Sequence, residues 1–175
     1  MDTKLPARQL KKLEALLDAD KPDVSELVKV DCDLCDQFNP NKIARDLSNL
    51  TSAQRGFYVS WWLEGEVNNG GFNQFLLNKG PVFAREAISF CESRGLAQLV
   101  DLLNRAIAAL PGGVLPETHD ELGDILVEDD EDDGPGPIEQ AHNELDSIFY
   151  DSGLGEQLML ERLRFVREHA DEFFK

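Results

Sequence analysis

The sequence predicts an all-α protein, a single-domain helical bundle of about seven to nine helices that spans residues 1–175. Apolar residues recur at the i, i+3, i+4 spacing of one helix face along most of the chain, most regularly from Leu96 to Leu110. Asn, Gly and Pro interrupt this spacing at short intervals, as they do at turns between helices. No segment alternates apolar and polar residues as a half-buried strand does, so we expect no sheet.

The expected helices of the first half begin and end at recognisable signals. Two N-terminal helices are expected within residues 5–38 and should pack onto the remainder. Thr51 is a suitable N-cap for a helix over 52–68, whose apolar residues surround much of its circumference. Such a helix belongs at the centre of a bundle. The Asn and Gly residues of 68–71 then stop it, because both residue types accept the left-handed conformation of a helix C-terminus.

Similar signals divide the second half of the chain. A short helix from Phe72 is expected to end at Gly80, and Pro81 suits the first turn of the next helix. Thr118 is a candidate N-cap of a later helix. The sequence EDDEDDGPGP, residues 128–137, predicts an acidic loop, because adjacent carboxylates repel one another and Gly and Pro do not continue a helix.

Negative charge is concentrated in one segment of the chain. The protein has 34 acidic and 17 basic residues, a net charge of −17 at pH 7. Residues 106–161 hold 16 of the acidic residues and no Lys or Arg, whereas residues 1–105 hold 15 acidic and 13 basic residues. This charge repels the phosphates of nucleic acids and anionic membranes, so we exclude direct binding to either and expect a basic protein partner.

We expect a cytoplasmic protein. The chain has no apolar run of the ~20 residues that cross a bilayer, and its N-terminus lacks the pattern of a signal peptide. Three cysteines are too few for a disulfide framework, which agrees with a reducing compartment. Cys32 and Cys35 form a CxxC, but neighbouring Asp residues disfavour a thiolate and no second ligand pair follows, so we interpret them as incidental.

The sequence has no pattern typical of an enzyme or a metal site, and we expect no cofactor. His119, His142 and His169 are far apart in the chain and are expected to be ordinary surface histidines. The acidic run matches the start of a calcium-binding EF-hand loop from Asp129. The twelfth position of that loop is Gln140 rather than the bidentate Glu, and prolines interrupt it, so we expect no specific calcium site.

The acidic residues after Gly113 indicate a different chemistry, the imitation of DNA. Four residues of a helix advance about 6 Å, whereas each strand of B-DNA carries one charge per ~3.4 Å. One helical row of carboxylates therefore has about half the linear charge density of a strand. A second row is needed, from residues 139–156 or from a second subunit. The alternative is a solvated acidic face with no specific partner.

The segment EVNNGGFNQFLLNKG, residues 66–80, is rich in amide side chains. These amides could line a ligand pocket beside Trp61 and Trp62. We favour a structural role, in which they cap helix ends and satisfy buried backbone groups around a tight turn. The residues of this motif are Trp62, Glu66, Asn69, Gly70, Gly71, Phe72, Gln74, Phe75 and Asn78.

The same segment gives the chain a resemblance to a known family. GEVNNGGFNQFLLNKG, then AREAISF and LAQLVDLLNRA, and the closing LDSIFYDSG and LERLRFVREHADEF resemble a family of small acidic bacterial proteins whose best-known member is a DNA mimic. The resemblance covers about residues 50–175. It implies an all-α homodimer whose acidic surface occupies the DNA-binding face of a basic regulator. Mimicry depends on surface charge rather than on a motif, and here the density of acidic residues in 106–161 carries it.

We therefore expect a DNA mimic that binds a basic DNA-binding protein, such as a transcription regulator, and blocks its binding to DNA. The alternatives are an immunity-type protein that binds another basic protein, and a small-ligand-binding helical protein that uses residues 62–74. The carboxylates expected to pair with the partner's Lys and Arg are those of Glu117, Asp120, Glu121, Asp124, Glu128, Asp129, Asp130, Glu131, Asp132, Asp133, Glu139, Glu144 and Asp146.

Overall fold

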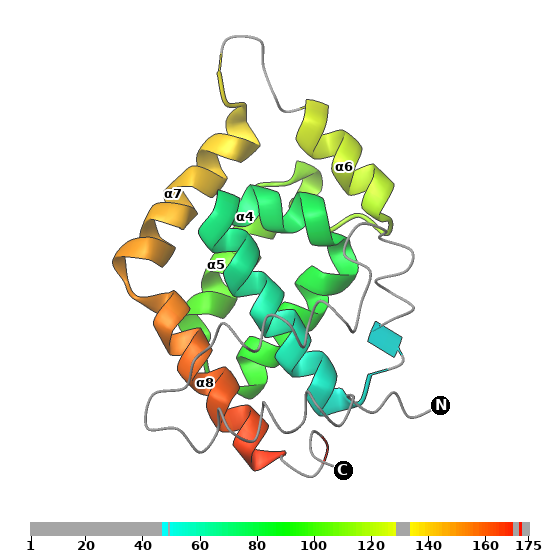
Figure 1. Ribbon diagram of the computed structural model, residues 1–175. Coiled ribbons are helices and arrows are strands. Elements are labelled where there is room, and N and C mark those ends of the chain that lie inside the picture. The colour runs from blue at the N-terminus through cyan, green and yellow to red at the C-terminus, as the bar shows by residue number, and fades with distance from the viewer. Residues whose placement is uncertain (1–46, 49, 129–133, 170–171, 173–175) are drawn as a thin grey trace. The chain divides into compact units, whose positions relative to one another are not determined.

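The computed structural model describes residues 47–48, 50–128, 134–169 and 172 (Figure 1). Within these residues the chain is all-α, as the sequence predicts, and no strand is assigned. The chain divides into two compact units, one of Val59–Leu160 and one of Met1–Tyr58 with Glu161–Lys175. The helices predicted within 5–38, and the CxxC that they contain, lie outside the described residues.

The described residues contain five α-helices rather than the seven to nine expected for the whole chain. The expected number is too high for this part of the chain, because α4 joins three of the predicted helices across two kinks. A 3-10 turn at Pro111–Gly113 follows α5. The helices are α4 (Ser52–Ser93), α5 (Ala97–Ala108), α6 (His119–Glu128), α7 (Pro137–Asp151) and α8 (Leu154–Glu168).

Glycines make the two kinks of α4. Gly70 and Gly71 leave the helical geometry at the first kink, and Gly80 leaves it at the second. Gly71 and Gly80 have φ of 76° and 74°, a region that glycine enters without the steric cost of a Cβ. The kinks coincide with the stops predicted from the sequence, and Pro81 opens the last piece as expected. The helical pieces of α4 are residues 52–69, 72–79 and 81–93.

Two helices begin at reciprocal capping boxes. At the start of α6, Glu121 N donates to Thr118 Oγ1 and Thr118 N donates to Glu121 Oε2, both at 3.2 Å. At the start of α4, Gln54 N donates to Thr51 Oγ1 at 3.2 Å and Thr51 N donates to Gln54 Oε1 at 3.1 Å. Each box satisfies N–H groups that the first turn of a helix cannot pair internally. The caps predicted at Thr51 and Thr118 are confirmed.

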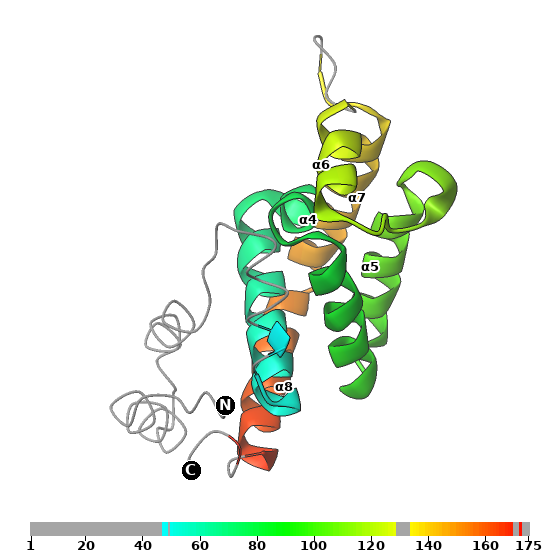
Figure 2. The same cartoon turned by 90° about the vertical axis from the view of Figure 1, so that its right-hand side faces the viewer.

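The core of the Val59–Leu160 unit lies between the pieces of α4 and the helices that flank them, α5, α6 and α7 (Figures 1 and 2). Phe72 and Phe149 are buried and meet edge to face, with ring centroids 6.2 Å apart, which joins α4 to α7. Where α5 packs against α7, His142 Nε2 lies 3.0 Å from the carbonyl oxygen of Ala106. His142 is therefore a core residue and not the surface histidine expected, because a backbone carbonyl pairs with one nitrogen of its ring inside the core.

The described part of the other unit comes from both ends of its sequence. Phe57 near the start of α4 and Val166 near the end of α8 are buried. Gln54 Nε2 donates a hydrogen bond to the carbonyl oxygen of Glu172 at 3.2 Å, so the capping residue Gln54 also contacts Glu172. Among the described helices, none combines the length and the apolar character that a membrane crossing needs.

Candidate functional site

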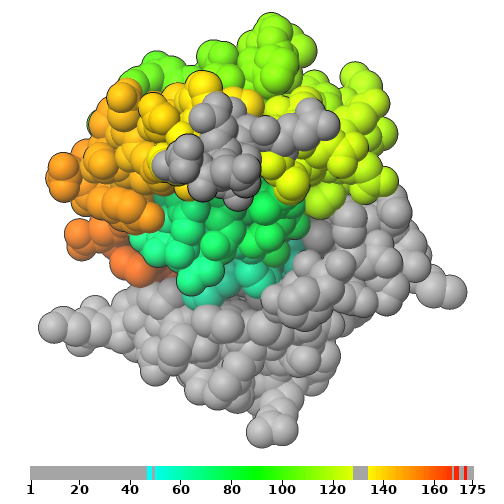
Figure 3. All heavy atoms as spheres, turned by 90° about the horizontal axis from the view of Figure 1, so that it is seen from above, coloured from blue at the N-terminus to red at the C-terminus, as the bar shows by residue number. Residues whose placement is uncertain are grey.

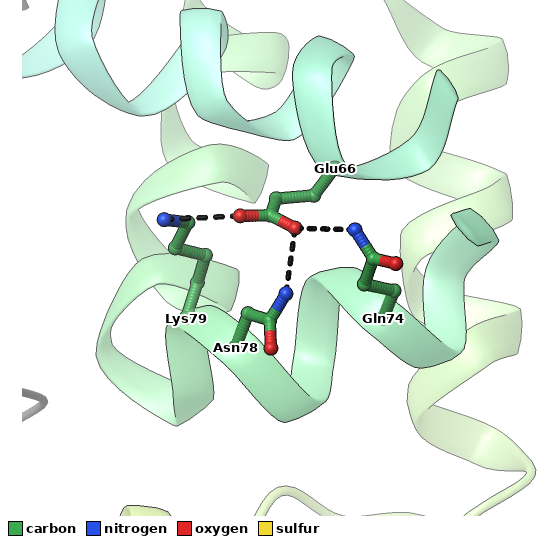
Figure 4. A network of polar contacts seen from close by, with 4 residues as sticks. All are labelled: Glu66, Gln74, Asn78 and Lys79. Carbon is green, nitrogen blue, oxygen red and sulfur yellow. Dashed lines mark hydrogen bonds and ion pairs between the residues drawn. The ribbon is translucent and has the colours of Figure 1, made fainter. Parts of the chain in front are cut away.

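Glu66 is the centre of a polar network within the motif segment (Figure 4). Its Oε1 lies 3.0 Å from Lys79 Nζ, and its Oε2 accepts hydrogen bonds of 2.8 Å from Gln74 Nε2 and Asn78 Nδ2. Glu66 belongs to the first piece of α4, whereas the three partners belong to the second piece. The network therefore joins the two pieces across their kink.

Both charges of this network are buried. The side chains of Glu66 and Lys79 are 8% and 3% exposed. Lys79 Nζ also lies 3.4 Å from the centroid of the Trp62 ring, a distance at which the ring face attracts a cation. Taking charges out of water costs several kcal/mol per ion unless each finds partners of the right geometry. Because both oxygens of Glu66 are occupied by protein groups, the arrangement supports the structural interpretation of the motif over a ligand pocket.

Asp146 of α7 caps the second piece of α4. Its Oδ1 accepts a hydrogen bond of 2.8 Å from Phe72 N, the first amide after the kink. A Cβ placed on Gly71 would overlap the same carboxylate, so only glycine allows this approach. Burial raises the pKa of Asp146, while the hydrogen bond from Phe72 and the nearby His142 act in the opposite direction. Asp146 thus fixes the position where the chain re-enters a helix.

Tyr150, one helical turn after Asp146, holds the other side of the same kink. Its hydroxyl donates to the carbonyl oxygen of Val67, which lies in the last turn before the kink. Burial and, secondarily, the negative charge of Asp146 raise the pKa of Tyr150. The phenol therefore remains a neutral donor at neutral pH, and α7 anchors both pieces of α4.

The remaining motif residues divide between the core and the surface. Phe75 is fully buried, whereas Asn69 is exposed. A Cβ on Gly70 would overlap the amide oxygen of Gln74, so this glycine leaves room for a partner of Glu66. Lys79 was not among the predicted motif residues. The available signal was that it is the only basic residue between Arg55 and Arg85.

The second candidate site is a set of exposed carboxylates, which we call the acidic surface. They project from α6, from the residue preceding its cap, from α7 and from the first turn of α8. None of these carboxylates forms an ion pair with a described residue. The members of the acidic surface are Glu117, Asp120, Asp124, Glu144, Asp151 and Glu156.

Two acidic helices meet at one end of the Val59–Leu160 unit. The end of α6 and the start of α7 lie side by side in Figure 1, and Figure 3 shows both helices on the same face. Glu121 is also exposed on α6 but takes part in the capping box, and Glu139 is half-buried in the first turn of α7. The acidic segment is therefore held by two helices rather than by one.

Some of the predicted partner-binding residues do not belong to this surface. Asp146 was expected there, but it is half-buried and its carboxylate is committed to the backbone of Phe72, because α7 turns that side of the helix toward the kink. The side chain of Glu128 and the whole of residues 129–133 lie outside the described residues.

The described cysteine and the acidic groups form no reactive or metal-binding cluster. Within the described ranges no group of three His, Cys, Asp or Glu side chains is arranged to hold a metal ion. Cys91 is a free, buried cysteine. Its burial, reinforced by the charge of Glu92, raises the pKa of the thiol to about 12, so it stays protonated at neutral pH.

Comparison with known proteins identifies one family. The model of a family described as DMP19-like protein matches residues 48–169, which is more than half of the chain. No curated protein and no solved structure matches the chain. The resemblance had led us to expect a family of DNA mimics, and the comparison corrects that assignment, because the matching model is that of the DMP19-like family. The chain belongs to the DMP19-like protein family.

Proposed function

We propose that the protein binds a basic DNA-binding protein through the acidic surface and competes with DNA for it. The observation that carries the proposal is that these exposed carboxylates have no ion-pair partner among the described residues. The segment 106–161, to which they belong, contains no Lys or Arg that could neutralise them. Such a surface attracts Lys and Arg, which the DNA-binding faces of proteins supply in number. A cytoplasmic location, where such partners act, is part of the proposal.

The carboxylates of α6 and α7 give one copy of the chain part of the charge density that mimicry of DNA requires. Asp120 and Asp124 are one turn apart on α6, about 6 Å along the axis, so this row alone has about half the charge density of a DNA strand. The exposed Glu144 of α7 belongs to a second row on the neighbouring helix. The second row adds charge within one unit, and a homodimer, in which a second copy adds further carboxylates, is a separate proposal that a mass measurement in solution tests.

An immunity-type protein that binds a basic protein without DNA-binding activity is the second candidate. It would use the same carboxylates and show the same dependence on salt, since both interactions pair exposed charges. Competition by duplex DNA separates the two, because DNA displaces only a protein that occupies a DNA-binding face.

The test starts from partners captured from a cell lysate at low salt and eluted separately with salt and with duplex DNA. Each captured partner is then purified, and its affinity for the full chain is measured at several salt concentrations with and without DNA. We expect affinity to fall steeply as salt rises and duplex DNA to release the partner. Release by salt but not by DNA would favour the immunity-type function. Affinity that does not change with salt would contradict both.

A matched pair of variants locates the binding surface. We expect Asp120→Asn with Asp124→Asn to weaken partner binding about tenfold at low salt. The control, Glu92→Gln with Asp101→Asn, changes the net charge equally but alters exposed residues outside the 106–161 segment. We expect it to weaken binding less than about twofold. Equal losses in both variants would place the interaction elsewhere on the chain.

A further inference from the structure

A pocket of about 240 Å³ opens at the turn between α7 and α8. One side of its lining comes from the first piece of α4, and the other from the residues on both sides of the turn. Every described residue of the lining belongs to the Val59–Leu160 unit. The pocket is separate from the Glu66 network, none of whose four members lines it.

The lining of the pocket is suited to a cation. Among the described residues that line it, the two carboxylates are those of Glu64 and Glu156, and none is a Lys, Arg or His. Tyr150 is 49% exposed as a residue and lines the pocket, while its hydroxyl donates its hydrogen to the carbonyl oxygen of Val67. The amide of Asn68 adds a carbonyl oxygen that accepts hydrogen bonds. A ring face beside carboxylates is the environment that a planar guanidinium group prefers.

The pocket is kept open by a glycine. Gly155 lies in the first turn of α8, where a Cβ would contact Phe149 Cζ at 3.4 Å and Asn68 Nδ2 at 3.9 Å. Both of these side chains line the pocket. Alanine would therefore be sterically tolerated at this position and would place a methyl group among the lining residues. Gly153, with φ of 68°, lies in the turn between α7 and α8.

We propose that this pocket binds the guanidinium group of an arginine side chain that the basic partner inserts. The inference rests on the proposed function, and the pocket shares Glu156 with the acidic surface. Tyr150 supplies the ring face and Glu156 the carboxylate, which accepts two N–H groups from one guanidinium. The surrounding carboxylates attract any basic face, whereas this pocket selects arginine over lysine, whose ammonium group is compact and strongly hydrated.

The pocket can be tested with small probes and the full chain alone. N-acetyl-arginine methylamide and N-acetyl-lysine methylamide are titrated separately, and the backbone amides of Gly153 and Gly155 are followed by nitrogen–proton correlation NMR. We expect saturable shifts of these amides with the arginine probe, with a dissociation constant of about 1–10 mM for so small a ligand. The lysine probe should bind at least about threefold more weakly. Equal binding of the two probes, or no saturable shift, would overturn the assignment.

Three variants separate the pocket from the general field of negative charge. Glu156→Gln should weaken binding of the arginine probe about fivefold, since it removes a carboxylate from the pocket. Asp151→Asn, which removes one exposed charge outside the lining, should change it less than about twofold. Gly155→Ala keeps every charge and should weaken binding about fivefold by filling space. Equal effects of the two charge variants would contradict the proposal, as would full binding by a folded Gly155→Ala variant.

The outcome is independent of the test of the proposed function. The probe titration contains no protein partner and no DNA. The pocket can therefore fail to bind the arginine probe while the protein still binds a partner that duplex DNA displaces. Conversely, a pocket that selects arginine in a protein with no partner released by DNA would leave the pocket assigned and the mimicry rejected.

Discussion

The Glu66 network and the acidic surface use the same functional group in opposite environments within one unit of the chain. Glu66 is buried, and both of its oxygens have protein partners. The carboxylates of the acidic surface are exposed and have no ion-pair partner among the described residues.

The difference shows how the surroundings of a carboxylate decide its role. An unpaired charge in the interior costs several kcal/mol, so a buried carboxylate persists only where the fold supplies every partner. Water solvates an exposed carboxylate, and repulsion between neighbours on a surface is screened by salt. The interior carboxylate therefore contributes to the fold, whereas the exterior ones remain available to a partner.

The largest effect is expected at the kink that the interior network joins. Gly71→Ala should lower the free energy of unfolding by about 3–5 kcal/mol, because it adds backbone strain at positive φ and forces Asp146 away from Phe72 N. Urea unfolding of the full chain measures this loss in the free energy of unfolding. Gly65→Ala is the control, since this exposed helical glycine has no neighbour within 4 Å of an added Cβ. It should raise stability by about 0.5–1 kcal/mol. A loss below ~1 kcal/mol in Gly71→Ala would show that the kink is not fixed.

The comparison itself is tested by neutralising one carboxylate of each kind. Glu66→Gln should lower the free energy of unfolding by about 3 kcal/mol, because it removes the carboxylate charge that lies 3.0 Å from the buried ammonium group of Lys79. Asp124→Asn on the acidic surface should change it by less than about 0.5 kcal/mol. Urea unfolding of both variants against the wild type gives the two numbers.

A double variant separates the ion pair from the packing around it. Adding Lys79→Met to Glu66→Gln removes both charges of the pair, so the double variant should lose less stability than the sum of the two single variants. Additive losses would mean that the two charges do not stabilise each other. The different effects of Glu66→Gln and Asp124→Asn would then come from packing alone.

The sequence predicted the local signals of this fold well. The kinks at 68–71 and at Gly80, and the caps at Thr51 and Thr118, follow from the intrinsic conformational and hydrogen-bonding preferences of single residues, which operate over one turn of helix. The number of helices in the described part was predicted less well. The kinks of α4 change the chain direction at one or two residues only, so helical structure continues on both sides of each stop.

The contacts between distant segments could not be predicted. The residues that flank Asp146 in the sequence do not distinguish it from the other acidic residues of its segment. Only the packing of α7 against α4 turns its side chain toward Phe72. The pairing of Glu66 with Lys79 likewise depends on how the kink folds the second piece of α4 back. Charge density predicted where carboxylates are concentrated, but which of them face solvent is decided by tertiary packing.

Asp146 provides the smallest and most discriminating test, because the sequence assigned it to the exterior group and the structure places it with the interior one. Its pKa is raised above the ordinary value of 3.8, chiefly by burial. Between its unfolded and folded pKa values the folded protein binds more protons than the unfolded protein, so stability falls as pH rises through that window. The contribution of this carboxyl is therefore complete below the unfolded pKa and is lost above the folded pKa.

Asp146→Asn removes this titration while keeping an oxygen that can accept the hydrogen bond from Phe72 N. The wild type should consequently lose stability relative to the variant as pH rises above the ordinary pKa of an aspartate, measured by urea unfolding of both proteins at each pH. Asp151→Asn, exposed at the end of the same helix, controls for the change in helix propensity. The prediction is contradicted if the difference in the free energy of unfolding between wild type and Asp146→Asn stays constant with pH, or if it grows in favour of the wild type. Asp146 would then behave like the solvated carboxylates of the acidic surface.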